Sequence, residues 1–466
     1  MIYYLKNKKE RKLYLESYGC QMNLSDSEII SSILADEGFI TYSELYDADL
    51  ILLNTCSIRE KAEINVRRRL IEFQNIKKKK PFIIIGILGC IAERLKNRWL
   101  EEEQIVDLVV GPDVYRYLPL LISKIEDGKS SINVLLSKEE TYADVSPLRL
   151  GNNSITAFVS ITRGCDNMCS FCVVHYTRGR ERSRDPITIV KECQKLWSQG
   201  YKEVSLLGQN VDSYLWYGGV MKKYFSKASP FQKATYLSFA DLLELVARSV
   251  PKMRIRFSTS NPYDMLENVI KVIAHYPNIC NYMHLPLQSG SSRVLELMNR
   301  RYSSEKYVSL IRKIRKIIPD CSISHDIIIG FCGELEEDHI QTLSLMEYVR
   351  YDFGYMFIYS LRAYTQASNR LFDDVPEEVK KRRLQEIIYL QKKHSYESMH
   401  ANIGKIQEVL IEGESRKSSR YWYGRNAYNA VVVFPKELYN KGDFVKVRIK
   451  TCTSATLIGQ GLEIVE

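Results

Sequence analysis

The sequence predicts an α/β protein in three parts: an N-terminal flavodoxin-like parallel sheet, a central partial (β/α)6 barrel and a C-terminal small antiparallel β-barrel. Two observations predict this architecture. Apolar segments typical of strands alternate with segments of helical period over most of the chain, interrupted by a linker-like stretch at residues 137–154. Near residue 400 the pattern changes to short alternating segments separated by Gly, Asn and Ser. We therefore expect domains at residues 11–135, 151–385 and 400–466.

The N-terminal part is expected to be an open parallel sheet. Its strand-like segments are LYLESYGC (13–20), DLILLNTC (49–56), PFIIIGILGC (81–90) and VDLVVGP (106–112). The second and third are continuous apolar runs, which are typical of strands buried on both faces. Helical patterns separate the segments, and this alternation favours a parallel sheet that gathers ligands at the carboxyl ends of its strands.

The central part is expected to form six βα units of a barrel, with the chemistry at the carboxyl ends of the strands. The strand-like segments are ITAFVSIT, EVSLLG, RIRFST, YMHLPL, CSISHDIIIG and YMFIYS. A long connection at residues 212–238, rich in Tyr and Lys, is either a functional lid or surface decoration.

A charged helix from Pro376 to about Ala401 leads to the last part of the chain. Here the segments IQEVLIEG, NAVVVFP, DFVKVRIK and TLIG are short and strand-like. They predict a small antiparallel barrel, which is a common scaffold for binding nucleic acid.

The composition narrows the class of protein. With 466 residues, of which 45% are hydrophobic and 26% charged, the chain is not mainly disordered. No apolar run approaches the roughly 20 residues of a membrane helix, and the first residues lack an export signal, so we expect a cytoplasmic protein without membrane segments. The net charge of +10 indicates an anionic partner. Eleven cysteines in a reducing compartment favour metal ligands or catalytic thiols over disulfides.

Three cysteines lie in one tight loop. RGCDNMCSFC places Cys165, Cys169 and Cys172 in a C-x3-C-x2-C pattern just after the first barrel strand. Three thiolates can bind three irons of a 4Fe–4S cluster and leave the fourth open to chelate S-adenosylmethionine, which one electron then splits into methionine and a 5′-deoxyadenosyl radical. The alternative is zinc, which usually takes four ligands in paired C-x2-C spacing. The pattern therefore predicts a radical cluster.

Cys20, Cys56 and Cys90 form a second, dispersed set. Each ends an apolar strand and precedes a helix, so in a parallel sheet all three would reach the same edge. The alternative is three packed thiols, because cysteine is among the most buried residue types. The equivalent placement favours ligands, and three ligands again imply a cluster with an open iron. The other five cysteines share no spacing and are expected to be core thiols: Cys193, Cys280, Cys321, Cys332 and Cys452.

The motifs around these cysteines resemble those of the radical-SAM methylthiotransferases, most closely their MiaB-type tRNA branch, over essentially the full chain. They are SYGCQMNLSDSE (17–28), NTCSIREKAE (54–63), LGCIAER (88–94), RGCDNMCSFCVVHYTRGRERSR (163–184), LLGQN (206–210), HLPLQSGS (284–291) and a C-terminal barrel similar to the TRAM domain. The chain departs from the family pattern at His175, Cys332, Leu335 and residues 360–368, without losing a cluster ligand.

The resemblance implies roles for named residues. The set of Cys20, Cys56 and Cys90 would hold an auxiliary 4Fe–4S cluster, the source or conduit of sulfur, and the loop cysteines would hold the radical cluster. Residues expected to bind S-adenosylmethionine are Phe171, Gly208, Gln209, Asn210, Gln288 and Asp326. For the polar residues the alternative is that they satisfy backbone groups of their own loops.

A basic strip follows the radical loop. TRGRERSR alternates Arg178, Arg180, Arg182 and Arg184 with other residues, and alternate arginines on an extended backbone can pair with phosphates. We expect Arg178, Arg180 and Arg182 to contact RNA.

The resemblance implies an enzyme that converts N6-isopentenyladenosine next to the tRNA anticodon into its 2-methylthio derivative, with two S-adenosylmethionine molecules per turnover. The implied partners are the anticodon stem-loop, a flavodoxin- or ferredoxin-type electron donor and a sulfur donor, and we expect a monomer. Met22 in the GCQMN stretch favours this substrate, because an apolar side chain could pack on a prenyl tail. The alternatives are methylthiolation of a ribosomal-protein aspartate or of tRNA threonylcarbamoyl-adenosine, and a non-enzymatic iron–sulfur RNA-binding protein.

Overall fold

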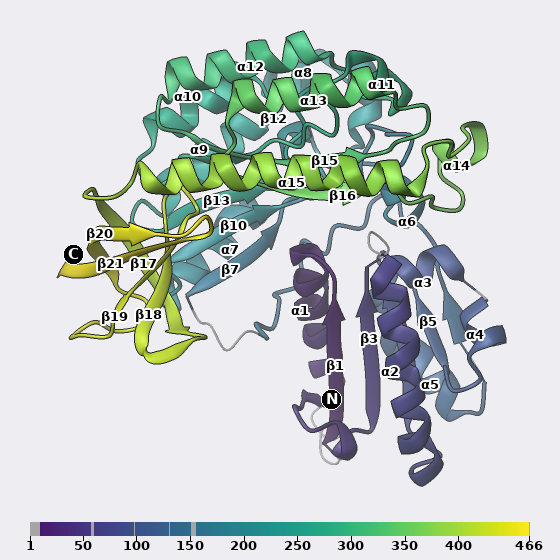
Figure 1. The fold of residues 1–466 in the computed structure, drawn as a ribbon. Helices are drawn as coiled ribbons and strands as arrows, with labels where there is room; N and C mark the ends of the chain where they lie inside the picture. The colour runs from purple at the N-terminus through teal and green to yellow at the C-terminus, as the bar shows by residue number, and fades with distance from the viewer. Residues whose placement is uncertain (1–9, 57–59, 97, 130, 151–154, 466) are drawn as a thin grey trace.

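The computed structural model describes residues 10–56, 60–96, 98–129, 131–150 and 155–465 and has the three parts that the sequence predicts (Figure 1). The N-terminal sheet, in purple and blue, lies beside the central barrel in teal and green. Helix α15 (Glu377–His400) runs along the central domain to the C-terminal barrel, in yellow. Across the described residues, no helix combines the length and the apolar character needed to cross a membrane.

The N-terminal domain is a six-stranded parallel sheet in the order β2-β1-β3-β4-β5-β6, with helices on both faces. Leu50 and Leu52 of β3 face one core, and Ile51 and Leu53 face the other, which explains the continuous apolar run. The sheet has two more short strands, β2 and β6, than the sequence predicts. The elements are β1 (Arg11–Tyr18), α1 (Gln21–Ala35), β2 (Phe39–Thr41), β3 (Leu50–Thr55), α2 (Glu60–Lys79), β4 (Ile84–Gly89), α3 (Cys90–Leu95), α4 (Arg98–Glu102), β5 (Leu108–Val110), α5 (Leu118–Glu126) and β6 (Ser131–Asn133).

The six predicted barrel strands are confirmed. They form two parallel three-stranded sheets, β13-β10-β7 and β14-β15-β16, which a parallel bridge between Ile255 and Ile279 joins. The strands are β7 (Thr156–Ser160), β10 (Glu203–Leu207), β13 (Arg254–Ser258), β14 (Tyr282–His284), β15 (Ser322–Ile329) and β16 (Phe353–Ile358). The helices that cover them are α7 (Pro186–Ser198), α9 (Phe239–Ser249), α10 (Glu267–His275), α12 (Ser304–Ile317) and α13 (Glu336–Val349).

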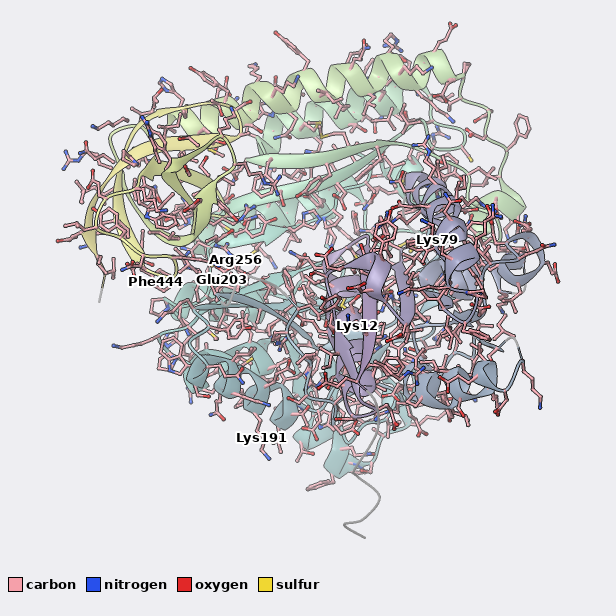
Figure 2. All side chains as sticks on the ribbon, turned by 90° about the horizontal axis from the view of Figure 1, so that it is seen from below. Lys12, Lys79, Lys191, Glu203, Arg256 and Phe444 are labelled. Atoms are coloured by element: carbon pink, nitrogen blue, oxygen red, sulfur yellow. The ribbon has the colours of Figure 1, made fainter. Side chains whose placement is uncertain are left out.

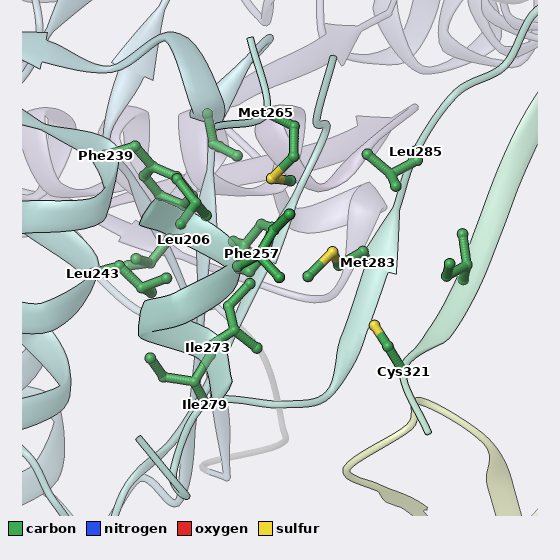
Figure 3. Close-up of a cluster of buried hydrophobic side chains, with 14 of the residues drawn as sticks. Leu206, Phe239, Leu243, Phe257, Met265, Ile273, Ile279, Met283, Leu285 and Cys321 are labelled. Carbon is green, nitrogen blue, oxygen red and sulfur yellow. The ribbon is translucent and has the colours of Figure 1, made fainter. Parts of the chain in front are cut away.

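Shorter elements connect these strands and helices. They are β8 (Thr162–Arg163), α6 (Val174–Thr177), β9 (Arg182–Ser183), β11 (Leu215–Trp216), α8 (Pro230–Thr235), β12 (Leu237–Ser238), α11 (Ser292–Leu297) and α14 (Gln366–Arg370). The large apolar core lies between the barrel strands and the helices, where Phe239 of α9 packs edge-on against Phe257 of β13 (Figure 3). Cys321 belongs to this core, and Cys193, Cys280 and Cys332 are also buried, as expected of core thiols, whereas Cys452 is only partly buried.

The long connection at residues 212–238 folds on itself. Its ends are tied by the antiparallel pair β11–β12, and Phe225 packs edge-on against both Tyr217 and Tyr236. The segment contributes no residue to the cavity described below. This arrangement favours surface decoration over a lid.

The C-terminal domain is a closed five-stranded barrel in the order β17-β18-β19-β21-β20. The strands are β17 (Ile406–Ser415), β18 (Ser418–Asn426), β19 (Val431–Pro435), β20 (Phe444–Cys452) and β21 (Thr456–Ile464). The barrel is antiparallel as expected except for one pair, because β19 and β21 pair in parallel. Strands that alternate in direction cannot close a ring of odd number, so one parallel pair is required.

Glu93 of α3 generates a stability prediction. Its side chain is buried, its Oε2 atom has no hydrogen-bond partner among the described residues, and burial raises its pKa from 4.5 to about 8. The unfolded chain releases this proton above pH 4.5, whereas the folded protein retains it until about pH 8, so this group makes stability fall as pH rises between those values.

We expect Glu93→Gln to stabilise the protein by about 2 kcal/mol at pH 7.5 and to have little effect at pH 4.5. Chemical denaturation at both pH values measures the difference, and Glu101→Gln, at an exposed position on α4, is the control. An equal effect of Glu93→Gln at the two pH values would contradict the prediction.

Candidate active site

A cavity of about 470 Å³ lies where the three domains meet. One wall consists of residues just beyond the carboxyl ends of β1, β3 and β4, and includes Cys20, Cys56 and Cys90. Val173, Val174, Thr177 and Arg178, which follow the radical loop, and residues of the central barrel form further walls, and Asn429 comes from the C-terminal barrel. The cavity therefore combines side chains from parts of the chain that are far apart in sequence.

The structure brings the three dispersed cysteines together as predicted. Strands β1, β3 and β4 are adjacent in the sheet, so their carboxyl ends carry all three thiols to one edge. Cys20 precedes α1, Cys56 follows β3 and Cys90 is the first residue of α3.

Gly19, the residue before Cys20, allows Cys20 and Cys56 to lie close together. Gly19 has φ +133°, and a Cβ built on it would lie 2.2 Å from the Cβ and 3.2 Å from the Sγ of Cys56. No side chain fits there without separating Cys20 from Cys56. The backbone is thus shaped so that three soft sulfur donors surround one space, which fits a polynuclear iron–sulfur cluster.

The charges around this set differ from one thiol to the next. The hydrogen bond with Cys56 lowers the pKa of Cys20 to about 6, with help from Arg178 and the backbone of Asn23 and Met22. Burial raises the pKa of Cys90, and Arg178 opposes this effect by donating from Nε to the Cys90 sulfur at 3.2 Å. A positive guanidinium therefore lies against the cysteines, where it favours thiolates.

The loop cysteines are held by a separate set of hydrogen bonds. The Cys172 amide donates to the Cys169 carbonyl at 3.0 Å, and the Cys165 amide donates to the Gly179 carbonyl at 3.3 Å. Arg300 donates from Nη1 to the Cys169 sulfur at 3.3 Å. Burial is the main cause that raises the pKa of both Cys165 and Cys172, so these thiols bind protons tightly until a metal displaces them.

The two cysteine sets have the same kind of donor atoms. In the described ranges, no three Cys, His, Asp or Glu side chains are arranged to hold a single metal ion. Each set supplies three thiols and one arginine that donates to a sulfur. Thiolates whose sulfur atoms accept hydrogen bonds from nearby side chains are suitable ligands for iron–sulfur clusters.

The basic strip is placed differently from the expectation. Arg178 and Arg182 are buried, and their guanidinium groups pair with Asp26 at 2.8 Å and Asp113 at 2.7 Å. Arg184 is also buried, against Glu192. Only Arg180 remains half exposed, with Asp166 at 2.9 Å. Phosphates cannot reach the buried groups, so the expectation that Arg178 and Arg182 contact RNA is corrected. The alternation of arginines in the sequence indicated one extended segment. It did not show that Asp26 and Asp113 of the N-terminal domain would cover this segment.

The residues expected to bind S-adenosylmethionine fall into two groups. Gly208 and Gln209 line the cavity, and the Gln209 side chain accepts a hydrogen bond from the Gly164 amide at 2.6 Å, next to Cys165. Asn210 donates to Asp264 at 2.6 Å, and its Oδ1 atom has no partner. Gln209 therefore does satisfy a loop backbone group, as the alternative proposed.

The other three, like Asn210, are not among the residues that line the cavity. Gln288, with φ +69°, exchanges backbone hydrogen bonds with β15. Asp326 of β15 has its Oδ2 atom 3.4 Å from Nε2 of His284, which lines the cavity. Phe171 packs edge-on against Phe331. The structure thus brings Asp326 to the cavity through His284.

Sequence reasoning missed the inner wall of the barrel. Tyr282 and His284 of β14, Tyr355 of β16 and Arg256 of β13 all line the cavity. Tyr282 stacks on Phe353 with ring centroids 5.4 Å apart, and Tyr355 is 52% exposed. The alternation of residue types within the strand segments indicated that one face of each strand would point into the barrel. It did not show what that face would contact.

The C-terminal barrel is tied to the base of this wall. Arg256 donates to Glu203 at 2.9 Å and to the Asn426 carbonyl at 2.7 Å, and in the described part of the chain its Nη1 atom has no hydrogen-bond partner. Arg254 donates to the Arg425 carbonyl at 2.8 Å and lies over the Phe444 ring. Figure 2 shows Arg256, Glu203 and Phe444 together where the yellow barrel meets the teal strands. The turn between β18 and β19 therefore closes one end of the cavity.

Three family descriptions match successive parts of the chain. "Uncharacterized protein family UPF0004" matches residues 12–111, the radical SAM superfamily matches residues 159–346, and the TRAM domain matches residues 400–462. The three matches follow the order of the sheet, the central barrel and the C-terminal barrel.

Full-length relatives agree with these matches. The chain is 63% identical to the tRNA-2-methylthio-N(6)-dimethylallyladenosine synthase of Christiangramia forsetii, over 98% of this chain and 95% of that protein. It is 59% identical to the protein of the same name from Flavobacterium johnsoniae, over 98% and 96%. Among solved structures, the radical S-adenosylmethionine methyltransferase TsrM from Kitasatospora setae covers 77% of this chain, and this chain covers 75% of it, with a TM-score of 0.56 and 14% identity. That last likeness concerns the fold alone.

We expect Arg256→Gln to lower the stability of the protein by about 3 kcal/mol, because it leaves Glu203 buried without its closest cation. It should also increase proteolytic release of the C-terminal barrel. Thermal unfolding and limited proteolysis measure the two effects, and Arg420→Gln on the exposed surface of the same barrel is the control. Equal behaviour of the two variants would show that the Arg256 contacts do not hold the domains together.

Proposed function

The chain belongs to the family of radical-SAM tRNA-2-methylthio-N6-dimethylallyladenosine synthases, and from that membership we propose how its cavity carries out the reaction. Family membership implies a 4Fe–4S cluster and S-adenosylmethionine. We propose two clusters, one on Cys165, Cys169 and Cys172 and an auxiliary one on Cys20, Cys56 and Cys90. The family activity is conversion of N6-isopentenyladenosine next to the tRNA anticodon into its 2-methylthio derivative.

One observation carries the two-cluster proposal. The cavity that Cys20, Cys56 and Cys90 line is also lined by Val173, Val174 and Thr177, which directly follow the radical loop. A radical generated at the loop and a sulfur held at the sheet edge would therefore act in the same enclosed space. This proximity is what replacement of the C2–H of an adenine by a methylthio group requires.

The two clusters, when bound, supply the electron that splits S-adenosylmethionine and the site at which the sulfur is presented. The residues of the chain position the other reactants. Gln209 fixes the radical loop through the Gly164 amide, and Gly208 permits close packing, because a Cβ there would lie 2.0 Å from the Thr162 hydroxyl. We propose that Phe171, Gly208, Gln209, Asn210, Gln288 and Asp326 surround S-adenosylmethionine, with two molecules consumed per turnover, one for the methyl group and one for the radical.

The acceptor base would lie against the aromatic part of the wall. Tyr282 is held by its stacking on Phe353, and His284 is oriented by a 2.8 Å hydrogen bond with Ser324. Aromatic faces stack on nucleic-acid bases without needing to read their edges. Gln21 and Met22 line the same cavity next to Cys20, and the apolar Met22 side chain is suited to a prenyl tail.

We propose that Arg180 and the C-terminal barrel contact the tRNA. Arg180 is the only member of the predicted strip whose side chain is substantially exposed. The protein would act as a monomer in the cytoplasm, where tRNA is found, with a flavodoxin- or ferredoxin-type electron donor and a separate sulfur donor. Modification of a ribosomal-protein aspartate or of threonylcarbamoyl-adenosine has no comparable support, because the full-length relatives carry the isopentenyladenosine name.

The division of labour between the two cysteine sets can be tested by substitution. Cys20→Ala, Cys56→Ala or Cys90→Ala should leave 5′-deoxyadenosine formation largely intact and abolish the methylthio product, whereas Cys165→Ala, Cys169→Ala or Cys172→Ala should abolish both. Iron content should fall from about eight to about four per chain in either set. Anaerobic reconstitution, iron analysis and mass spectrometry of nucleosides measure these outcomes, and Cys193→Ala, a core thiol, is the control. A methylthio product from the first three variants would disprove the proposed roles.

The substrate assignment can be tested with two tRNAs that differ only in the prenyl tail. The isopentenylated form should be modified and the unprenylated form rejected, because the missing tail forfeits ~0.8 kcal/mol for each methylene that would be buried. Met22→Ser should weaken the preference, since Met22 lines the cavity. Equal kcat/KM for the two tRNAs in the unmodified enzyme would overturn the substrate assignment while leaving the radical chemistry in place.

A further inference from the structure

Arg178 is buried, which is unusual for an arginine side chain. It follows the radical loop in the sequence, but its side chain is only 4% exposed and lies between the central and N-terminal domains. Its three nitrogens have different surroundings. Nε donates to the Cys90 sulfur at 3.2 Å, Nη2 donates to Asp26 at 2.8 Å, and Nη1 has no hydrogen-bond partner among the residues that the structure describes.

The unpartnered nitrogen belongs to a residue of the cavity wall. Arg178 lines the cavity together with Cys20, Cys56 and Cys90. Leaving a charged N–H unpaired in a buried site costs free energy, so an N–H without a partner in the described part of the chain is available to a bound ligand. An anion or a strong acceptor bound beside Cys90 would complete the hydrogen bonds of Arg178.

Asp26 fixes the guanidinium in this orientation. One carboxylate oxygen accepts from Arg178 and the other from Arg163 at 2.8 Å, and the carboxylate is fully buried. Arg163 donates to the same carboxylate and, from Nη2, to the Pro112 carbonyl, and within the described residues it makes no hydrogen bond to a cysteine sulfur. The two arginines therefore share the domain-joining ion pair, and only Arg178 extends to the sulfur.

We propose that Arg178 is a positioning residue of the auxiliary site, which donates to the Cys90 sulfur and presents its remaining N–H to an anionic sulfur, such as hydrosulfide, bound beside that cysteine. This inference rests on the proposed function, because it assumes an auxiliary cluster on Cys20, Cys56 and Cys90. A hydrogen bond and a positive charge at a ligand sulfur stabilise the reduced, more negative state of an iron–sulfur cluster and so raise its reduction potential. The same N–H would hold the incoming sulfur in a fixed orientation.

The test uses the full chain with Cys165, Cys169 and Cys172 replaced by Ala, so that only the auxiliary cluster is present. In this background, the midpoint potential of the cluster is measured by redox titration monitored by electron paramagnetic resonance. Arg178→Gln should make the potential more negative, and Arg178→Lys, which keeps the charge, should restore part of the difference. Arg163→Gln, the matched control, disturbs the same Asp26 pair and should leave the potential nearly unchanged.

A second measurement follows the binding of sodium sulfide through the change in the resonance spectrum. Arg178→Gln should weaken the apparent affinity for sulfide roughly tenfold, in line with the loss of one charge-assisted hydrogen bond. If Arg178→Gln fails to take up iron while the Arg163→Gln protein does, and both iron-free proteins unfold at similar temperatures, the positioning of Cys90 by Arg178 is supported directly.

Two results would overturn this inference without affecting the two-cluster proposal. One is an unchanged potential and sulfide affinity in Arg178→Gln. The other is an equal change in Arg178→Gln and Arg163→Gln, which would indicate that the ion pair with Asp26 has only a structural role. Absence of iron from the parent protein with the three Ala substitutions would instead overturn the two-cluster proposal, and this inference with it. The two failures are therefore distinguishable.

Discussion

The buried ion pairs of Asp26 are the interaction on which the active site depends. Asp26 lies on α1, six residues after Cys20, and accepts from Arg163 and Arg178, which flank the radical loop on either side. A buried charge left alone costs several kcal/mol, so the domains are stabilised in the one arrangement that pairs all three groups. Asp113 and Arg182 form a second pair across the same interface. These charges hold the sheet edge that carries Cys20, Cys56 and Cys90 against the segment that follows the radical loop.

The cavity also shows why the cysteines had to be at the ends of adjacent strands. A parallel sheet brings the carboxyl ends of β1, β3 and β4 to one edge, and the tight turns into the following helices aim the side chains at a common space. Glycine at position 19 allows the first turn to approach the second to within a distance that any side chain would block. The site thus follows from backbone geometry first and from side-chain chemistry second.

The C-terminal barrel has a structural part in the site besides any contact with RNA. Its turn between β18 and β19 supplies Asn429 to the cavity wall and a backbone carbonyl to Arg256. Arg256 is thereby held from two domains, by Glu203 of the central barrel and by Asn426 of the C-terminal one. The sequence suggests that the C-terminal barrel is a separate module, but in the fold this domain forms part of the cavity wall.

The sequence by itself determined the three-part α/β fold, the six barrel strands and the two sets of cysteines, because hydrophobic period and ligand spacing are local properties of the chain. Gly208 and Gln209, which the family resemblance implies as S-adenosylmethionine contacts, line the cavity. Only the tertiary structure decided the roles of the arginines. The alternation of Arg178, Arg180 and Arg182 in the sequence is the same whether these side chains face phosphates or carboxylates. Arg178 pairs with Asp26, 152 residues away, and Arg182 pairs with Asp113, 69 residues away. The aromatic wall of Tyr282 and Tyr355 and the closure by Asn429 likewise depend on contacts between distant segments, which no local pattern encodes.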